Sequence, residues 1–156
     1  MKLISVNKSK IKKPIHIEDI KVGQIENFKI KITKKIHNDF KNFSKDKSPI
    51  HTNKKFCKKN GYKNVVGHAF LLTTILSNIY GMYFPGGNEL CVRQTCNFRQ
   101  PFFIGDTLRY KVKVISVNKL NKIIILNIEI KNNSNFMIFD GESILKLSLK
   151  GDGQKK

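Results

Sequence analysis

The sequence predicts one α+β domain in which a curved antiparallel sheet wraps around a single long, buried central helix. Residues 65–83 are apolar on more than one face, as expected of a helix that is buried nearly all round. Beyond them, apolar and polar residues alternate in runs separated by short turns, which is the pattern of half-buried strands. A chain of 156 residues with 40% apolar side chains is long enough for one core of this kind and short for two.

The two ends of the chain differ from its middle. Residues 1–20 are rich in lysine and have little periodicity, so we expect a basic, extended N-terminal arm. Residues 21–150 then form the single domain. Residues 151–156 (GDGQKK) are expected to be a disordered tail.

Before the central helix we expect one strand and two short helices. Residues 24–36 alternate from Phe28 onward, which indicates a strand. Residues 37–43 have aromatic side chains at an i, i+3 spacing, which suits a short helix ending near Ser44. A second short helix is capped by Asn53 and stopped by the Asn-Gly pair that follows Lys59.

The predicted central helix ends at the Pro-Gly-Gly turn of residues 85–87. Turn residues then separate the later strands, with Asn121 in one turn and an Asn-Asn pair in the next. The strands themselves are expected near residues 110–114, 124–130 and 136–149.

The formal net charge of +19 raises the possibility of a nucleic-acid partner, because clustered Lys and Arg bind phosphates. In the sequence, however, the lysines are spread over both ends and most loops, together with many Ile and Asn residues. A solvated basic surface is therefore favoured over a specific polyanion site, and no specific nucleic-acid partner is expected.

Several classes of site and location are disfavoured by what the sequence lacks. Three cysteines without CxxC spacing argue against a disulfide framework or zinc site, and the four histidines show no metal-ligand spacing, so we expect no metal and no bound cofactor. No run of about 18 apolar residues and no signal-peptide pattern is present. We therefore expect a cytoplasmic protein without a membrane partner.

The segment that carries the chemistry is SKDKSPIH, residues 44–51. It places the Asp46 carboxylate and the His51 imidazole five residues apart, in a turn that contains Pro49. Acid–base catalysis with water requires one group that takes a proton from the water and another that delivers a proton to the substrate. Histidine suits this role near neutral pH, and a nearby carboxylate can orient it or share the water. By itself, such a pair is more often a helix cap and a surface histidine.

From about residue 23 to residue 149 the chain resembles the MaoC-like dehydratases and R-specific enoyl-CoA hydratases. The resemblance lies in the order and spacing of SKDKSPIHTNKKF, VVGHAFLLTTILSNIYG, the PGG turn and NFRQPFFIGDTLRYKVKV. The last segment carries the family's pattern of Phe, Pro and Gly-Asp-x-Leu at Phe98, Pro101, Gly105, Asp106 and Leu108.

This resemblance implies a hot-dog fold, at least a homodimer joined edge to edge, and syn hydration of a trans-2-enoyl thioester to the (R)-3-hydroxyacyl product, or the reverse. The thioester carrier is coenzyme A or the phosphopantetheine of an acyl carrier protein. The family's catalytic pair falls on Asp46 and His51. Its helix serine falls on Ser77, where a hydroxyl could bond the catalytic carboxylate or only its own helix backbone.

The chain departs from the family at two positions. Ser48 stands where the family usually has Asn before the proline, and either residue can hydrogen-bond the turn. Ala69, between His68 and Phe70, replaces a Gly whose N–H meets the thioester oxygen; Ala69 keeps that N–H at a helix N-terminus, and its methyl narrows the approach. His68 could be a second acid–base group, but a structural role is favoured.

Two other functions stay open from the sequence. A hot-dog thioesterase would need a carboxylate on or beside the central helix, and residues 66–83 contain no Asp or Glu. A non-catalytic module that binds an acyl carrier or a polyanion would have no need of an acid–base pair in a turn.

Overall fold

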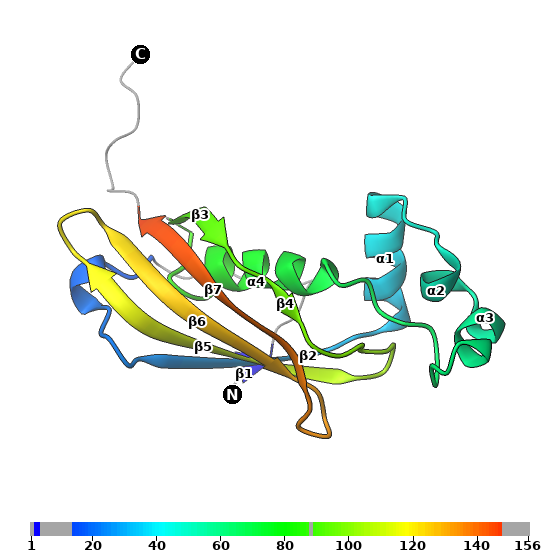
Figure 1. The fold of residues 1–156 in the computed structure, drawn as a ribbon. Coiled ribbons are helices and arrows are strands. Elements are labelled where there is room, and N and C mark those ends of the chain that lie inside the picture. Colours follow the sequence, from blue (N-terminus) through cyan, green and yellow to red (C-terminus); the bar gives the residue numbers. More distant parts are fainter. Residues whose placement is uncertain (1, 4–13, 88, 148–156) are drawn as a thin grey trace, which may run out of the picture.

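The computed structural model describes residues 2–3, 14–87 and 89–147. One sheet and one central helix form the body of the described part of the chain (Figure 1). In chain order the elements are β1 (Lys2–Leu3), the 3₁₀ helix η1 (Ile17–Asp19), β2 (Ile25–Lys31), α1 (Lys34–Ser44), α2 (Pro49–Thr52), α3 (Lys54–Lys59), α4 (Leu71–Met82), β3 (Glu89–Gln94), β4 (Asn97–Phe98), β5 (Thr107–Asn118), β6 (Ile123–Lys131) and β7 (Met137–Leu147).

The sheet has the strand order β1-β2-β5-β6-β7-β3, and β4 also pairs with β7. All of these pairs are antiparallel except β1 with β2. The alternation of apolar and polar residues in the sequence explains why each of these strands buries one face. In β6 every second side chain, from Ile124 to Ile130, is fully buried, whereas the side chains between them are only partly covered. The predicted strands after the central helix and their turns are confirmed, whereas the strand predicted over residues 24–36 ends at Lys31 and residues 34–36 belong to α1.

The central helix α4 packs against the sheet, as predicted, but it begins later than residue 65. Residues 65–70 are not helical, because their backbone bonds to residues 102 and 103, in the segment between β4 and β5. Val66 forms an isolated bridge with Phe103, and the Gly67 N–H donates to the Phe102 carbonyl at 2.7 Å. The prediction of a helix over residues 65–70 was therefore wrong.

The described part of the expected N-terminal arm is folded onto the domain. Ile17 and Ile20 are 7% and 3% exposed and belong to the main core, and Lys2–Leu3 form the parallel strand β1. Isoleucines at a three-residue spacing are enough to anchor η1 to the core. The domain thus reaches further toward the N-terminus than residue 21. Residues 4–13 of the arm and the tail 151–156 lie outside the described residues.

Helices α1, α2 and α3 project beyond the end of α4, to one side of the sheet (Figure 1). We call residues 34–63, which contain them, the helical lobe. Thr33 caps α1 by accepting from the Ile36 N–H at 3.2 Å, and Asn53 caps α3 by accepting from the Phe56 N–H at 3.0 Å. Between these two helices lies the SKDKSPIH segment.

None of the helices in the described part of the chain has the length and hydrophobicity of a membrane span. The three cysteines are free thiols, as expected.

Candidate active site

The Asp46 carboxylate is held by the turn that follows α1. Lys45 has a left-handed backbone (φ 59°), which ends the helix and reverses the chain. The Asp46 Oδ1 atom then accepts from the Ser48 hydroxyl at 2.7 Å and from the Ser48 N–H at 3.0 Å. These two hydrogen bonds, the hydroxyl first, lower the pKa of Asp46 below its ordinary value. The carboxylate is therefore ionised at neutral pH, and its Oδ2 atom stays available.

His51 lies in α2 with one ring nitrogen fixed. Its Nδ1 lies 2.9 Å from the Val66 carbonyl oxygen. A carbonyl only accepts, so Nδ1 carries the proton and the neutral ring presents a bare Nε2. That Nε2 is 3.6 Å from Asp46 Oδ2. The separation is too long for a good direct hydrogen bond but suits two acceptors that share one water molecule.

His68, just before α4, joins Asp46 and His51 in one cluster. It is buried, with 3% of its surface exposed. Its Nε2 donates to the backbone carbonyl of Asp46 at 3.2 Å, and its ring stacks on that of His51 with centroids 4.0 Å apart. Burial lowers the pKa of His68. Because the neutral imidazole of His68 donates its one N–H to the Asp46 backbone, we expect His68 to support Asp46 and His51 rather than to donate a proton to solvent.

His37 is a member of the site that the sequence did not reveal. Lying on α1 and 2% exposed, it donates from Nε2 to the His51 carbonyl oxygen at 2.9 Å. Its ring centroid is 4.9 Å from that of His68, and burial lowers its pKa. One signal was present in the sequence. His37 lies three residues before Phe40, on the apolar face of the predicted helix, where a polar side chain needs a buried partner.

His37→Leu tests this contact. Losing the donor leaves a covered His51 carbonyl unpaired, so we expect about 1–3 kcal/mol lower free energy of unfolding in urea. Because His51 shifts with its backbone, we expect kcat to fall about tenfold or more. His37→Gln, which can still donate, should recover part of kcat, and His16→Leu at an exposed position is the matched control. A His37→Leu protein with unchanged kcat would show that the contact has no effect on the pair.

Asp46, His51 and His68 place three potential ligand atoms within 4.8 Å of one another. A tetrahedral metal site needs donor atoms that converge on one point. The rings of His51 and His68 are stacked with their planes 25° apart, and the His68 Nε2 proton is donated to the Asp46 carbonyl oxygen. In this arrangement the His68 Nε2 is not a free ligand atom, which leaves Asp46 Oδ2 and His51 Nε2 as the two available atoms of the cluster.

Ala69 precedes α4 by two residues, and its carbonyl accepts from the Leu72 N–H in the first turn. Within the described part of the chain the Ala69 N–H donates no hydrogen bond, so it is free to meet a ligand oxygen. It borders a cavity of about 230 Å³ that also includes the predicted motif residues Phe98 and Pro101. The Gly105-Asp106 pair forms the expected turn, with Gly105 at φ 101° and Asp106 Oδ2 accepting from the Phe103 N–H.

Ser77 lies further along α4, exposed, and lines a different cavity of about 290 Å³ together with Tyr80 and Gln94. Six residues of helix, roughly 9 Å, separate it from Leu71. The described chain does not bring Ser77 within hydrogen-bond distance of Asp46, and that hydrogen bond stays a prediction.

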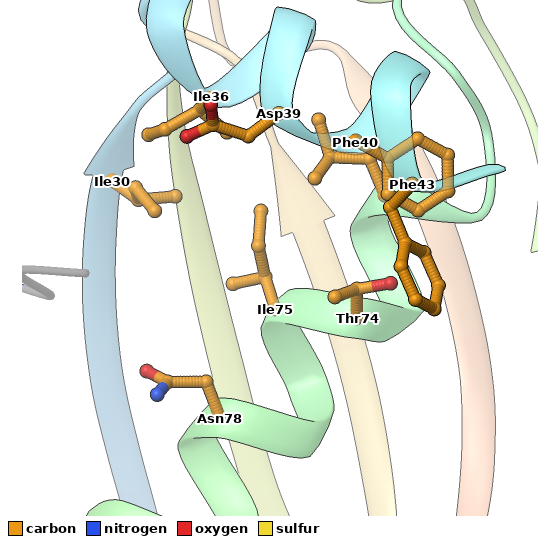
Figure 2. Close-up of a pocket in the computed structure, with 9 residues that line it drawn as sticks. Ile30, Ile36, Asp39, Phe40, Phe43, Thr74, Ile75 and Asn78 are labelled. Carbon is orange, nitrogen blue, oxygen red and sulfur yellow. The ribbon is translucent and has the colours of Figure 1, made fainter. Parts of the chain in front are cut away.

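A further cavity, of about 340 Å³, lies between α1 and α4 and does not reach the Asp46 carboxylate. Figure 2 shows its apolar walls and the amide of Asn78 at one end. Phe40 lines it and also contacts the His68 ring, with centroids 5.2 Å apart, so this aromatic ring stands between the cavity and the cluster.

The Ser48 hydroxyl gives a test of the site by pH. Ser48→Ala removes the main cause of the lowered Asp46 pKa, so that pKa rises toward its ordinary value. At acid pH, near the ordinary pKa of an aspartate, more of the carboxylate is then protonated, so kcat/KM of Ser48→Ala relative to wild type should fall along the lower part of the acid limb while the ratio at pH 7.5 changes little. Ser44→Ala is the matched control, because the Ser44 hydroxyl accepts from the Asp46 N–H and does not touch the carboxylate. Identical acid limbs for Ser48→Ala and wild type would contradict a role for ionised Asp46.

Comparison with known proteins identifies the family. A family model described as MaoC like domain matches residues 13–133, well over half of the chain. The chain belongs to the MaoC-like domain family.

Two curated relatives agree with this assignment. The 3-hydroxybutyryl-CoA dehydratase of Methylorubrum extorquens is 30% identical over 100 residues, which are 64% of this chain and 64% of that protein. The (R)-specific enoyl-CoA hydratase of Aeromonas caviae is 26% identical over 108 residues, 69% of this chain and 81% of that protein. The matched stretch thus spans under two thirds of the first relative's length.

Among solved structures, the (R)-hydratase from A. caviae involved in PHA biosynthesis superposes with a TM-score of 0.79. The alignment covers 84% of this chain and 99% of that chain at 24% identity. A likeness at this identity shows the fold, and the predicted hot-dog fold of this MaoC-like protein is confirmed.

Proposed function

We propose that this MaoC-like protein catalyses the reversible syn addition of water to a trans-2-enoyl thioester, giving an (R)-3-hydroxyacyl thioester. The observation that carries the proposal is the 3.6 Å separation of Asp46 Oδ2 and His51 Nε2, with the His51 Nδ1 proton fixed on Val66. The family membership and the relatives' activities support the reaction class.

In the proposed reaction one water molecule donates its two hydrogens to Asp46 Oδ2 and His51 Nε2, which leaves an oxygen lone pair free to attack the β-carbon. As the C–O bond forms, one O–H bond of the water breaks and its proton passes to Nε2. The adjacent ionised Asp46 stabilises the resulting imidazolium. The imidazolium then returns this proton to the α-carbon on the same face, so the atoms of water are added across the double bond.

Negative charge develops on the thioester oxygen during attack. The free N–H of Ala69, two residues before the start of α4, is the donor that we assign to this oxygen. An N–H at a helix N-terminus favours an anion. The 230 Å³ cavity beside Ala69 would then receive the thioester group.

Stereochemistry tests this mechanism. With crotonyl-CoA in D₂O, the product should be (R)-3-hydroxybutyryl-CoA with one deuterium on the α-carbon, added syn to the hydroxyl, as read by chiral chromatography and NMR. An S product, or anti addition, would contradict delivery of both parts of water from the Asp46–His51 side.

We also infer a homodimer that joins through β3. This strand pairs only with β7 among the described strands, and its Leu90 and Val92 side chains are 64% and 58% exposed. Sedimentation of a stable, fully active monomer would contradict the dimer.

A thioesterase is less well supported, because α4 has no carboxylate and Asp46 is held in the lobe by Ser48.

A further inference from the structure

Of the chain's formal net charge of +19, the helical lobe carries +8, the largest share of any part that the structure describes; residues 1–13 carry a further +5 and residues 148–156 carry +2. Residues 34–63 contain ten lysines and two aspartates, a net charge of +8 in 30 residues. Residues 14–33 have a net charge of zero, residues 64–87 contain no Asp, Glu, Lys or Arg, and residues 89–147 carry +4. A uniform lysine bias of the whole chain does not explain this distribution.

The lobe's positive charge is not neutralised internally. Nine of its ten lysines are exposed. Lys35 pairs with Asp39 at 2.7 Å, and Lys63 lies 4.0 Å from Asp106. The other eight lysines have no described carboxylate within 4.0 Å. The lobe therefore presents an open cationic surface to whatever approaches it.

This surface surrounds the catalytic turn. Lys45 and Lys47 flank Asp46, whose side chain is 45% exposed on the same lobe. In Figure 1 the lobe lies at one end of the sheet, with α2 and α3 on its outer side. A substrate that enters toward Asp46 passes these lysines.

We propose that the helical lobe is the docking surface for an acidic acyl carrier protein that delivers the acyl thioester to Asp46 and His51. This inference rests on the proposed function and names its carrier. The lysines come from α1, the turn and α3, and α1 alone is about 16 Å long. The few phosphates of a nucleotide cover only part of such a surface, whereas a protein face of about 800 Å² can cover all of it.

The test compares one acyl group on two carriers. We would measure kcat and KM for the crotonyl group on a purified acidic acyl carrier protein and on coenzyme A. The variant is Lys54→Glu/Lys55→Glu, at the start of α3, where negative charge is compatible with the helix dipole. The matched control is Lys113→Glu/Lys119→Glu, two exposed lysines of β5 and the turn after it.

For the carrier-bound substrate, the lobe variant should lower kcat/KM about tenfold or more, mainly through KM, with a much smaller change for crotonyl-CoA. Salt at about 0.3 M should narrow the difference between variant and wild type. The control pair should behave like wild type. An equal loss on both carriers, or an equal effect of the control pair, would overturn the proposal.

Calorimetric titration with the carrier protein bearing no acyl group separates this inference from the proposed function. Binding that depends on Lys54 and Lys55 in a protein without hydratase turnover would support the docking surface and contradict the reaction. Turnover of crotonyl-CoA without carrier binding would support the reaction and contradict the docking surface. Binding of single-stranded RNA through the same lysines, more tightly than the carrier, would also overturn the assignment of the partner.

Discussion

His51→Ala is expected to lower kcat for hydration of crotonyl-CoA by about 10²–10⁴-fold, with little change in KM. The substitution removes the Nε2 atom that takes the water proton and returns it to the α-carbon. It also removes the hydrogen bond to the Val66 carbonyl, at a position that is only partly buried, so the fold should persist.

Asp46→Asn should have an effect of similar size for a different reason. The amide keeps the shape of the carboxylate and can still accept from Ser48, but it loses the charge that stabilises the His51 imidazolium. The two losses should not add, because both residues serve one proton transfer. His16→Ala at an exposed position is the control for substitution of a histidine. Near-normal kcat in both His51→Ala and Asp46→Asn would refute the assignment of the pair.

The second large effect is expected for Gly67→Ala, on stability as well as activity. A Cβ atom at position 67 would lie 2.1–2.6 Å from three atoms of the Phe102 ring. Phe102 is 2% exposed, and the Gly67 N–H donates a hydrogen bond to the Phe102 carbonyl, so neither the Phe102 ring nor the Gly67 backbone can move away freely. Overpacking of this kind costs about 1–3 kcal/mol or more. Because Val66 and His68 adjoin Gly67, kcat should fall too.

Urea unfolding followed by circular dichroism measures this effect. Gly81→Ala in α4 is the matched control, since its Cβ would meet only Glu89 Oε1 at 3.6 Å and alanine favours a helix by about 0.5–1 kcal/mol. Adding Phe102→Leu to Gly67→Ala should restore part of the stability. If Gly67→Ala unfolds at the wild-type urea concentration, the close approach of Gly67 to Phe102 is not a constraint on this fold.

Most of the fold could be predicted because its strands are half-buried. The alternation in β5 and β6 follows directly from one covered and one solvated face, and the Asn53 cap is a local signal. The start of α4 could not be predicted in this way. Residues 65–70 look helical in sequence, but Val66 and Gly67 bond to Phe103 and Phe102, which lie far along the chain.

The candidate site was predictable only where its geometry depends on residues close together in the sequence. The distance between Asp46 and His51 depends on one short turn, so the sequence was sufficient to place them together. The contact of His37 with His51 requires α1 to fold back over α2, and the stacking of His68 on His51 brings together residues from two parts of the chain. The ten lysines of the lobe fall in one stretch of 30 residues and could be counted in the sequence, whereas the folding of that stretch into a lobe around Asp46 comes from the structure.

The most direct measurement is the absorbance of crotonyl-CoA at the enoyl-thioester band with wild-type protein and with His51→Ala, alongside a thiol assay on the same samples. The proposed function predicts a loss of absorbance with wild type, no release of thiol, and no change with His51→Ala. Release of thiol in step with the loss of absorbance would instead show hydrolysis of the thioester and contradict the hydratase assignment.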